Sequence, residues 1–250
     1  MRSLSLYKTL HFVAMTGQLY LIPTPLGEGA LEPLPAYLIQ QVHQLDVFIA
    51  ERGKTARQFL KAIKTPIPLQ EMTFFELNKR THPDDIASFL EPALKEGKNI
   101  GLLSEAGCPG VADPGAVVVQ LAHDLGVKVN PLVGPSSILL ALMASGMNGQ
   151  QFAFHGYLPI KTPERRKTLK NLERRSSKEN QTQIFIETPY RNDGFIEDAL
   201  AALQPQTLFG IAADLTLPSE YVVTHSVKNW RKKTIPKLHK RPAIFMLLAR

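Results

Sequence analysis

Residues 104–115 read Ser-Glu-Ala-Gly-Cys-Pro-Gly-Val-Ala-Asp-Pro-Gly, a dense group of turn residues with two carboxylates. An apolar run at 100–103 precedes this stretch, and an apolar helical pattern over 116–125 follows it. A Gly- and Pro-rich turn between a strand and a helix lies where α/β proteins bind ligands. Glycine there lets the backbone approach a ligand closely. We therefore predict an α/β fold with a ligand site at this turn.

Two further loops have the same character. Residues 133–137 read Val-Gly-Pro-Ser-Ser after the apolar run 127–132, and residues 23–27 read Pro-Thr-Pro-Leu-Gly after the run 18–22. The carboxyl ends of neighbouring parallel strands share one crevice, which suits a small polar ligand. The sequence carries neither the usual dinucleotide fingerprint after its first strand nor a P-loop.

The N-terminal half alternates strand and helix patterns, which predicts a mainly parallel sheet covered on both faces. Its predicted strands are 18–22, 46–50, 99–103 and 127–132, and its predicted helices are 32–44, 54–63, 83–96, 114–125 and 136–144. A turn-rich stretch at 146–150 marks a boundary. We expect an N-terminal extension at 1–16, an α/β domain at 17–149 and a basic α/β domain at 150–250.

The C-terminal half shows a second set of elements. Its predicted strands are 152–157, 182–186, 207–212, 221–224 and 243–248, and its predicted helices are 163–176 and 192–203, with a polar loop at 176–181. The last strand is strongly apolar, so we expect it at the centre of its sheet. Residues 1–15 are interpreted as a leader or extension outside the fold, with Met15 as an alternative start.

Composition narrows the class of protein. Hydrophobic residues make up 44% of the 250, enough for a packed core, and no apolar run is long enough for a membrane span. The single cysteine, Cys108, excludes an internal disulfide framework and is typical of a cytoplasmic protein. No Cys/His spacing indicates a structural metal site.

The positive charge is concentrated at one end of the chain. Residues 161–250 hold 17 Lys and Arg against 9 Asp and Glu, a net of +8, whereas residues 1–160 hold 12 against 13, a net of −1. Such asymmetry indicates a polyanionic partner. On the predicted helix 163–176, Arg166, Lys167, Lys170 and Arg174 fall within one arc, with Leu169 and Leu172 pointing away. Trp230, which lies beside basic residues, is expected to pack rather than to stack a base.

Six motifs occur in one order between residues 18 and 249. They read LYLIPTPLG at 19–27, IAER at 49–52, the stretch 104–115, GPSS at 134–137, FHGYLP at 154–159 and IETPYR at 186–191. Together they resemble the tetrapyrrole methylase family, most closely the branch that methylates a ribose 2′-hydroxyl of small-subunit ribosomal RNA. The resemblance implies two α/β domains, S-adenosylmethionine (SAM) in the cleft between them, and a homodimer.

The resemblance also implies which residues contact the cofactor. These are Pro25, Leu26, Glu105, Ala106, Gly107, Cys108, Ser136, Ser137, Ala212 and Pro242. From the residues alone, Ser136 or Ser137 is also a plausible helix cap, and Asp113 is either a cap or a ligand. Cys108 is interpreted as a small residue facing the ligand rather than as a nucleophile.

Methyl transfer to a hydroxyl needs close placement of donor and acceptor and benefits from a base. Glu51 and Glu187, which each follow a predicted strand, are the candidate catalytic carboxylates. The candidate substrate-binding residues are Arg52, Asn78, Arg166, Lys170 and Arg191. A surface ion pair of Glu51 and a structural Glu187–Arg191 brace remain alternatives.

These observations predict a SAM-dependent methyltransferase that acts in the cytoplasm on ribosomal RNA or on the small ribosomal subunit. The basic residues of the C-terminal domain form two clusters. The first surrounds the predicted helix 163–176, and the second comprises Lys228, Arg231, Lys232, Lys233, Lys237, His239, Lys240 and Arg241. Two such clusters in one domain favour contacts with the phosphate backbone. One alternative keeps the enzyme but changes its acceptor to a porphyrin- or corrin-like ring. A second alternative is a non-enzymatic RNA-binding protein that retains the ligand fold.

Overall fold

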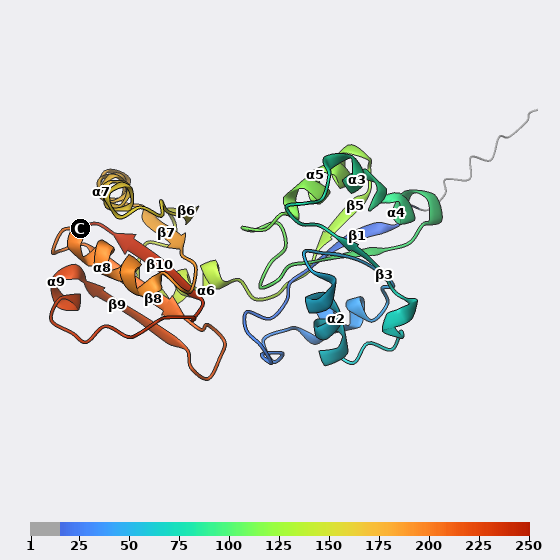
Figure 1. Ribbon diagram of the computed structural model, residues 1–250, viewed down its shortest axis with the longest axis horizontal. Helices are drawn as coiled ribbons and strands as arrows, with labels where there is room; N and C mark the ends of the chain where they lie inside the picture. Colours follow the sequence, from blue (N-terminus) through green and yellow to red (C-terminus); the bar gives the residue numbers. More distant parts are fainter. Residues whose placement is uncertain (1–15) are drawn as a thin grey trace, which may run out of the picture. The chain divides into compact units, whose positions relative to one another are not determined.

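The computed structural model describes residues 16–250, so the extension predicted at residues 1–15 lies outside the described residues. The chain divides into two compact units (Figure 1). The first comprises residues 16–22, 40–105 and 109–132. The second comprises residues 23–39, 106–108 and 133–250, so three segments that precede residue 150 pack with the C-terminal part of the chain.

The first unit holds a five-stranded parallel sheet in the order β3-β2-β4-β1-β5. Its strands are β1 (Gln18–Ile22), β2 (Val47–Ala50), β3 (Thr73–Glu76), β4 (Ile100–Leu103) and β5 (Lys128–Pro131). The prediction of a parallel sheet is confirmed. Strand β3 was not predicted, because its four residues TFFE lack the apolar run of the other strands.

Both faces of this sheet are covered, as its strand sequences require. Leu19, Ile49 and Leu102 pack with Val118 of helix α5 (Ala116–Asp124) in one apolar cluster. Successive strand residues point to opposite faces. Phe48 therefore faces the other side, where it is also fully buried. Helix α2 (Gly53–Ala62) buries its own apolar residues, Phe59 and Leu60 among them. The helix α1 (Ala36–Val42) follows the β1 loop.

The predicted helix 83–96 is in fact two helices, α3 (Pro83–Ser88) and α4 (Glu91–Glu96). Pro92 lies in the first turn of α4, where its missing N–H costs nothing, but it cannot continue a helix that began earlier. Gly97 ends α4 in a left-handed conformation with φ of 68°. A short 3-10 turn, η1 (Leu69–Glu71), precedes β3.

The second unit holds a mixed five-stranded sheet in the order β6-β7-β10-β8-β9. Its strands are β6 (Phe152–Tyr157), β7 (Thr182–Ile186), β8 (Leu208–Ala213), β9 (Tyr221–Ser226) and β10 (Ala243–Leu248). Strand β10 pairs antiparallel with both β7 and β8. The prediction that residues 243–248 form the central strand is confirmed.

The faces of this second sheet carry different helices. Phe185, Phe245 and Phe209 pack with residues of α7 (Thr162–Glu179) and α8 (Asn192–Ala202). Ile184 and Ala212 point the other way and pack with α6 (Ser137–Ser145). The short helix α9 (Val227–Trp230) follows β9. Trp230 is 1% exposed and donates from Nε1 to the Phe209 carbonyl at 2.7 Å, so it packs as expected.

Helix α7 is longer than predicted, because it continues through Ser176 to Glu179 and ends at Asn180 in a left-handed conformation. The expected polar loop at 176–181 was wrong in its first half. Arg175 pairs with Glu179 one turn later at 3.0 Å, and Ser176 is fully buried and accepts a hydrogen bond from the Ala249 N–H. Asparagine, like glycine, tolerates the left-handed backbone that ends a helix.

Candidate functional site

The three Gly- and Pro-rich loops meet within the second unit. Thr24 and Gly107 exchange backbone hydrogen bonds of 3.0 and 3.1 Å, forming an isolated antiparallel bridge. The Cys108 Sγ lies 3.5 Å from the Pro135 carbonyl oxygen, which accepts its weak hydrogen bond. A methyl group on Gly134 would lie 2.3 Å from Cβ of Pro23. The sequence predicted a shared crevice, and these contacts join the three loops in pairs.

Gly107 is the residue that this junction constrains most. Its φ is +77°, a left-handed conformation that side chains with a Cβ rarely adopt. A Cβ at this position would lie 3.1 Å from Cδ2 of Leu26 and 3.4 Å from the Pro135 carbonyl oxygen. Only glycine therefore combines the required backbone with the close approach of the neighbouring loops.

The remaining residues that were predicted to contact the cofactor differ in their surroundings. Ser136 is the N-cap of α6, and its Oγ accepts from the Leu139 N–H at 3.5 Å, while Ser137 opens the helix. Leu26 and Ala212 belong to one apolar cluster under α6. Ala212 is 1% exposed, so its side chain lies inside this cluster. The Pro242 carbonyl accepts from the Asp214 N–H at 3.0 Å.

Pro25 is half-buried and Ala106 is exposed at the same loops. Burial raises the pKa of the Cys108 thiol. A raised pKa keeps the thiol protonated at neutral pH, and the thiolate is the nucleophilic form. This finding agrees with the interpretation of Cys108 as a small loop residue.

Two carboxylates, Glu51 and Glu105, lie just beyond the carboxyl ends of β2 and β4 in the first unit. These strands are adjacent and parallel, with Ala50 opposite Leu103, so Glu51 and Glu105 leave the sheet along the same edge. Glu105 Oε2 accepts from the Thr55 hydroxyl at 3.2 Å. Thr55, on α2, was not predicted as a site residue, because only the tertiary fold brings it to this edge.

Asp113 holds the glycine-rich loop together. Its Oδ1 accepts from the Gly110 N–H at 2.6 Å and from the Gly115 N–H at 2.8 Å. Burial raises the pKa of Asp113 above its ordinary value of 3.8, while the two N–H groups lower it and nearby Glu51 raises it. Asp113 is therefore a loop brace, and helix α5 begins after it with no side-chain cap.

We expect different results from two substitutions at Asp113. Because its pKa is raised on folding, the stability that the protonated form contributes is complete below about pH 3.8 and is lost as pH rises through the folded pKa. Asp113→Asn keeps an oxygen acceptor without charge, so its stability relative to wild type should rise between pH 4 and pH 7. Asp113→Ala leaves two N–H groups unpaired and should cost about 1–3 kcal/mol. Urea unfolding at both pH values measures this, and equal losses in both variants would contradict it.

Glu187 and Arg191 form an ion pair in the second unit. Glu187 Oε1 accepts from Arg191 Nε at 3.0 Å and from the Thr188 N–H at 2.6 Å, and its side chain is fully buried. The other oxygen, Oε2, is buried without a hydrogen-bond partner among residues 16–250. The structural brace anticipated from the sequence is present, and the unused oxygen leaves a polar role for Glu187 open.

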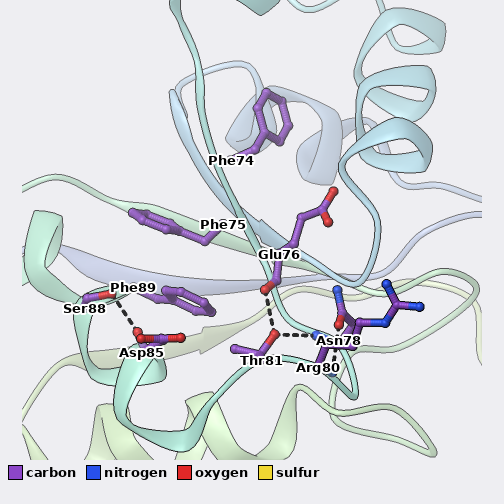
Figure 2. A pocket seen from close by; sticks show the side chains of 9 residues that line it. All are labelled: Phe74, Phe75, Glu76, Asn78, Arg80, Thr81, Asp85, Ser88 and Phe89. Carbon is purple, nitrogen blue, oxygen red and sulfur yellow. Dashed lines mark hydrogen bonds between the residues drawn. The ribbon is translucent and has the colours of Figure 1, made fainter.

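An open pocket of about 570 Å³ lies beside β3 and α3, at the carboxyl end of the edge strand (Figure 2). Its lining residues are Phe74, Phe75, Glu76, Asn78, Arg80, Thr81, Asp85, Ser88 and Phe89. Phe75 stacks on Phe89 with ring centroids 5.0 Å apart, and Asn78 Oδ1 accepts from the Arg80 N–H at 2.9 Å. Arg52 is exposed at the start of α2, and the next residue, Gly53, donates its N–H to Glu76 Oε1 at 2.9 Å.

Asn78 was predicted from the sequence as a substrate-binding residue, whereas the phenylalanines of this pocket were not. The run Phe74-Phe75-Glu76 was the available signal, since aromatic residues are enriched in strands. Phe89, which lies thirteen residues further on and belongs to the turn between α3 and α4, joins the pocket only through the tertiary fold.

The basic face predicted on α7 is confirmed, because Lys167, Lys170 and Arg174 are exposed whereas Leu169 and Leu172 are buried. Arg166 differs from its neighbours. Its Nε donates to Asp198 Oδ1 at 2.8 Å, beside the buried pair of Arg165 and Asp198.

Burial raises the pKa of Asp198, but hydrogen bonds from Arg165 and Arg166 outweigh this effect and lower the pKa overall. Arg166 is thus partly structural, although 46% of its side chain stays exposed. In the second basic cluster, Arg231 donates to the Leu200 carbonyl and Arg241 pairs with Asp214.

Within residues 16–250, no group of three His, Cys, Asp or Glu side chains has an arrangement that could hold a metal ion. None of the helices in the same residues has the length and apolar character that a membrane span needs.

Comparison with known proteins gives a family match and consistent relatives. The family described as Tetrapyrrole (Corrin/Porphyrin) Methylases matches residues 18–230. The chain is 32% identical to "Ribosomal RNA small subunit methyltransferase I" of Haemophilus influenzae, over 87% of this chain and 73% of that protein. Proteins of the same name in Bacillus subtilis and Thermotoga maritima are 35% and 31% identical, covering 75% and 87% of this chain and 59% and 93% of those proteins.

Solved structures also resemble this chain. The methyltransferase CobJ aligns with a TM-score of 0.60 at 16% identity, covering 94% of this chain and 100% of that chain. A uroporphyrin-III-C-methyltransferase from Thermus thermophilus aligns with a TM-score of 0.51 at 19% identity, covering 93% and 92%. At this level of identity the likeness concerns the fold, and it confirms the prediction of two α/β domains.

Proposed function

This chain belongs to the tetrapyrrole methylase family, and from that membership we propose that it is a SAM-dependent methyltransferase acting on small-subunit ribosomal RNA. The proposed acceptor is a ribose 2′-hydroxyl. The observation that carries the enzyme assignment is the junction of the Thr24, Gly107 and Pro135 loops. These loops are joined by the backbone bridge between Thr24 and Gly107 and by the contact of the Cys108 thiol with the Pro135 carbonyl, and a Cβ at Gly107 would crowd Leu26.

The residues of this junction fit the proposed cofactor. Glycine adopts the left-handed backbone at position 107 without strain, and it leaves the main chain of this loop without a side chain that would screen it from a ligand. Leu26 is half-buried and offers an apolar side chain, and the half-buried Ser136 and Ser137 offer polar groups. When bound, SAM would supply a methyl group on a sulfonium, so that an O–CH3 bond can form at the acceptor as the C–S bond breaks and the sulfur leaves as a neutral thioether.

The residues of this chain would position the acceptor and take its proton. Glu51 lies at the carboxyl edge of the first sheet and is the proposed base for the hydroxyl proton. The pocket beside β3 supports a role in holding the acceptor nucleotide, since it combines the stacked Phe75 and Phe89 with the polar Asn78 and Arg80. Arg52 and Arg191 are proposed to contact the substrate backbone.

Two observations support ribosomal RNA over a tetrapyrrole as the substrate. Relatives that are 31–35% identical carry a ribosomal RNA methyltransferase name, whereas the structures of CobJ and of the uroporphyrin-III-C-methyltransferase share only 16–19% identity with this chain. The exposed lysines of α7 lie on an outward helix face, which suits an extended polyanion. Calorimetry with SAM tests the enzyme assignment, and methyl transfer to small ribosomal subunits against tetrapyrrole precursors tests the substrate.

The strength of RNA binding should fall steeply with salt concentration. Each neutralised phosphate contributes about −0.7 to −0.9 to the slope of log K against log salt. Replacing Lys167, Lys170 and Arg174 together by serine should flatten that slope by about 2 units and leave SAM affinity unchanged. These three residues avoid Arg166, whose loss would disturb buried Asp198.

A matched control removes the same charge from exposed positions of the first unit, at Lys61, Lys64 and Lys128. Filter binding to small-subunit RNA between 50 and 300 mM KCl, the range chosen for the experiment, measures both slopes. If the α7 variant and the control variant lose equal amounts of slope, the α7 face has no special role. A wild-type affinity that ignores salt would contradict the RNA assignment itself.

We further propose a cytoplasmic homodimer. The single cysteine and the proposed substrate support the location. The dimer is supported by apolar side chains on one face of α6, where Leu139 and Met143, four residues apart, are 51% and 78% exposed. No such stripe was recognised from the sequence. Light scattering of the purified chain tests the dimer, because a monomer mass at micromolar concentration would contradict it.

A further inference from the structure

Two loops of the second unit present an exposed aromatic pair. Tyr190 is 69% exposed, and its ring meets that of His239 edge-on, with centroids 5.6 Å apart and planes at 75°. His239 is itself exposed. Large aromatic rings contribute most of their free energy when they are buried. A tyrosine left open against a second ring therefore suggests a surface that a ligand covers.

The Tyr190 loop has a defined conformation. Tyr190 lies in the turn between β7 and α8, which the hydrogen bond from the Arg191 N–H to the Thr188 carbonyl closes at 2.9 Å. The adjacent ion pair between Arg191 and Glu187 fixes the end of this turn. A second bond of 2.9 Å, from the Lys240 N–H to the Pro189 carbonyl, ties this loop to the one that carries His239.

The His239 loop is anchored from below. Leu238 is fully buried, and its N–H donates to Asp193 Oδ1 at 2.8 Å. Buried Asn192 donates from Nδ2 to the Leu238 carbonyl at 3.1 Å and to the Arg241 carbonyl at 2.7 Å. Two side chains of α8 thus hold the loop on both sides of His239. Because both rings are held in advance, a ligand would bind them without the entropic cost of ordering a loop.

The exposed charged side chains of these two loops are basic. Lys237 and Lys240 flank His239 and are exposed, and neither 188–191 nor 237–240 contains a carboxylate. Other cations of the same cluster are engaged elsewhere, since Arg231 and Arg241 bind carbonyl or carboxylate groups. Trp230, the aromatic residue that sequence analysis considered for stacking, is buried.

We propose that Tyr190 and His239 form a stacking platform for an unpaired base of RNA, with Lys237 and Lys240 on the adjoining phosphates. This inference rests on the proposed function and names a surface for its substrate. Aromatic side chains beside a basic groove are how proteins bind single-stranded nucleic acid without reading its sequence. A duplex offers no free base face, so the platform selects single-stranded segments, loops or ends.

The test compares Tyr190→Ala, Tyr190→Phe and the control Tyr37→Ala, which removes a tyrosine that is 58% exposed on α1. Affinities for a single-stranded oligoribonucleotide and for a duplex of the same sequence are measured at fixed salt. Tyr190→Ala should weaken single-strand binding about 5- to 150-fold, the range for loss of one base–aromatic stack. Tyr190→Phe, Tyr37→Ala and duplex binding should stay near wild type.

A second pair of substitutions separates phosphate contacts from stacking. Lys237→Ser with Lys240→Asn should reduce the single-strand salt slope by about 0.7 for each lysine. Asparagine is chosen at position 240 because Lys240 has a φ of 64°, which asparagine tolerates. Tyr190→Ala should leave the salt slope unchanged, since it removes no charge.

The outcomes are distinguishable. Single-strand affinity that survives Tyr190→Ala, or falls equally in Tyr190→Phe, overturns the platform while the methyltransferase proposal stands. Equal losses for single strand and duplex also overturn it, because they indicate a folding defect or a shape contact. A wild-type chain that binds no RNA of either kind overturns both the platform and the RNA substrate, and SAM calorimetry then tells whether the enzyme assignment survives.

Discussion

Replacing Gly107 by valine should abolish SAM binding while the chain stays folded. The valine Cβ would approach Leu26 Cδ2 to 3.1 Å, and its two methyl groups would occupy the space where the three loops meet. The φ of +77° adds strain of about 1–2 kcal/mol for any residue with a Cβ. We expect the affinity for SAM in calorimetry to fall below detection, because the ligand and the side chain compete for the same volume.

Gly126→Val is the matched control for this substitution. Gly126 also has a left-handed backbone, with φ of 72°, but no atom lies within 4 Å of a Cβ built there. Gly126→Val should lose stability through backbone strain alone, and Gly107→Val should lose at least as much, because its Cβ also crowds Leu26. Only Gly107→Val should lose SAM. Normal SAM affinity in a folded Gly107→Val variant would refute the placement of the cofactor at this junction.

The second large effect is expected at Glu51. Glu51→Gln keeps the size of the side chain and removes the proton acceptor, so turnover should fall about 10²- to 10⁴-fold, the usual cost of losing one general base. SAM affinity and thermal stability should change little, since this carboxylate is half-buried at a strand end. Single-turnover methylation of small subunits, with SAM affinity measured in parallel, separates chemistry from binding.

Comparison with Glu187 and Asn78 sharpens this test. Glu187→Gln disturbs a buried ion pair with Arg191 and should lower thermal stability, unlike Glu51→Gln. Asn78→Ala should raise KM for the subunit more than it lowers kcat if its pocket holds the acceptor nucleotide. Wild-type turnover in Glu51→Gln would contradict the proposal that Glu51 is the base. Methyl transfer would then depend on positioning of donor and acceptor alone.

The elements of the central sheets could be predicted from sequence because their apolar runs are local. Strands β1, β6, β7 and β10 have the predicted bounds, and Pro23 directly follows the apolar run of β1. Prediction failed where the local signal was weak or mixed. Strand β3 carries two polar residues out of four, and Pro92 starts a new helix inside an otherwise helical pattern.

The candidate site divides in the same way. Gly107, Ser136 and Asp113 were recognised because glycine, serine and aspartate at turns have specific local uses. The partners of these residues were not recognised, because a hydrogen bond such as that of Thr55 to Glu105 joins positions 50 residues apart. The sequence also did not show which basic side chains are already paired within the protein. Arg166 and Arg241, for example, bind carboxylates from other elements.

The sequence by itself determined the fold class, the family and the three turns that carry the ligand site, because these depend on apolar periodicity and on the backbone freedom of glycine and proline. Only the tertiary structure decided that those turns meet at Gly107, and that the exposed rings of Tyr190 and His239 are in contact. The physical reason is that such contacts arise when distant segments pack into one core. Leu238 and Asn192 illustrate this, since they lie 46 residues apart and are joined by a hydrogen bond within that core.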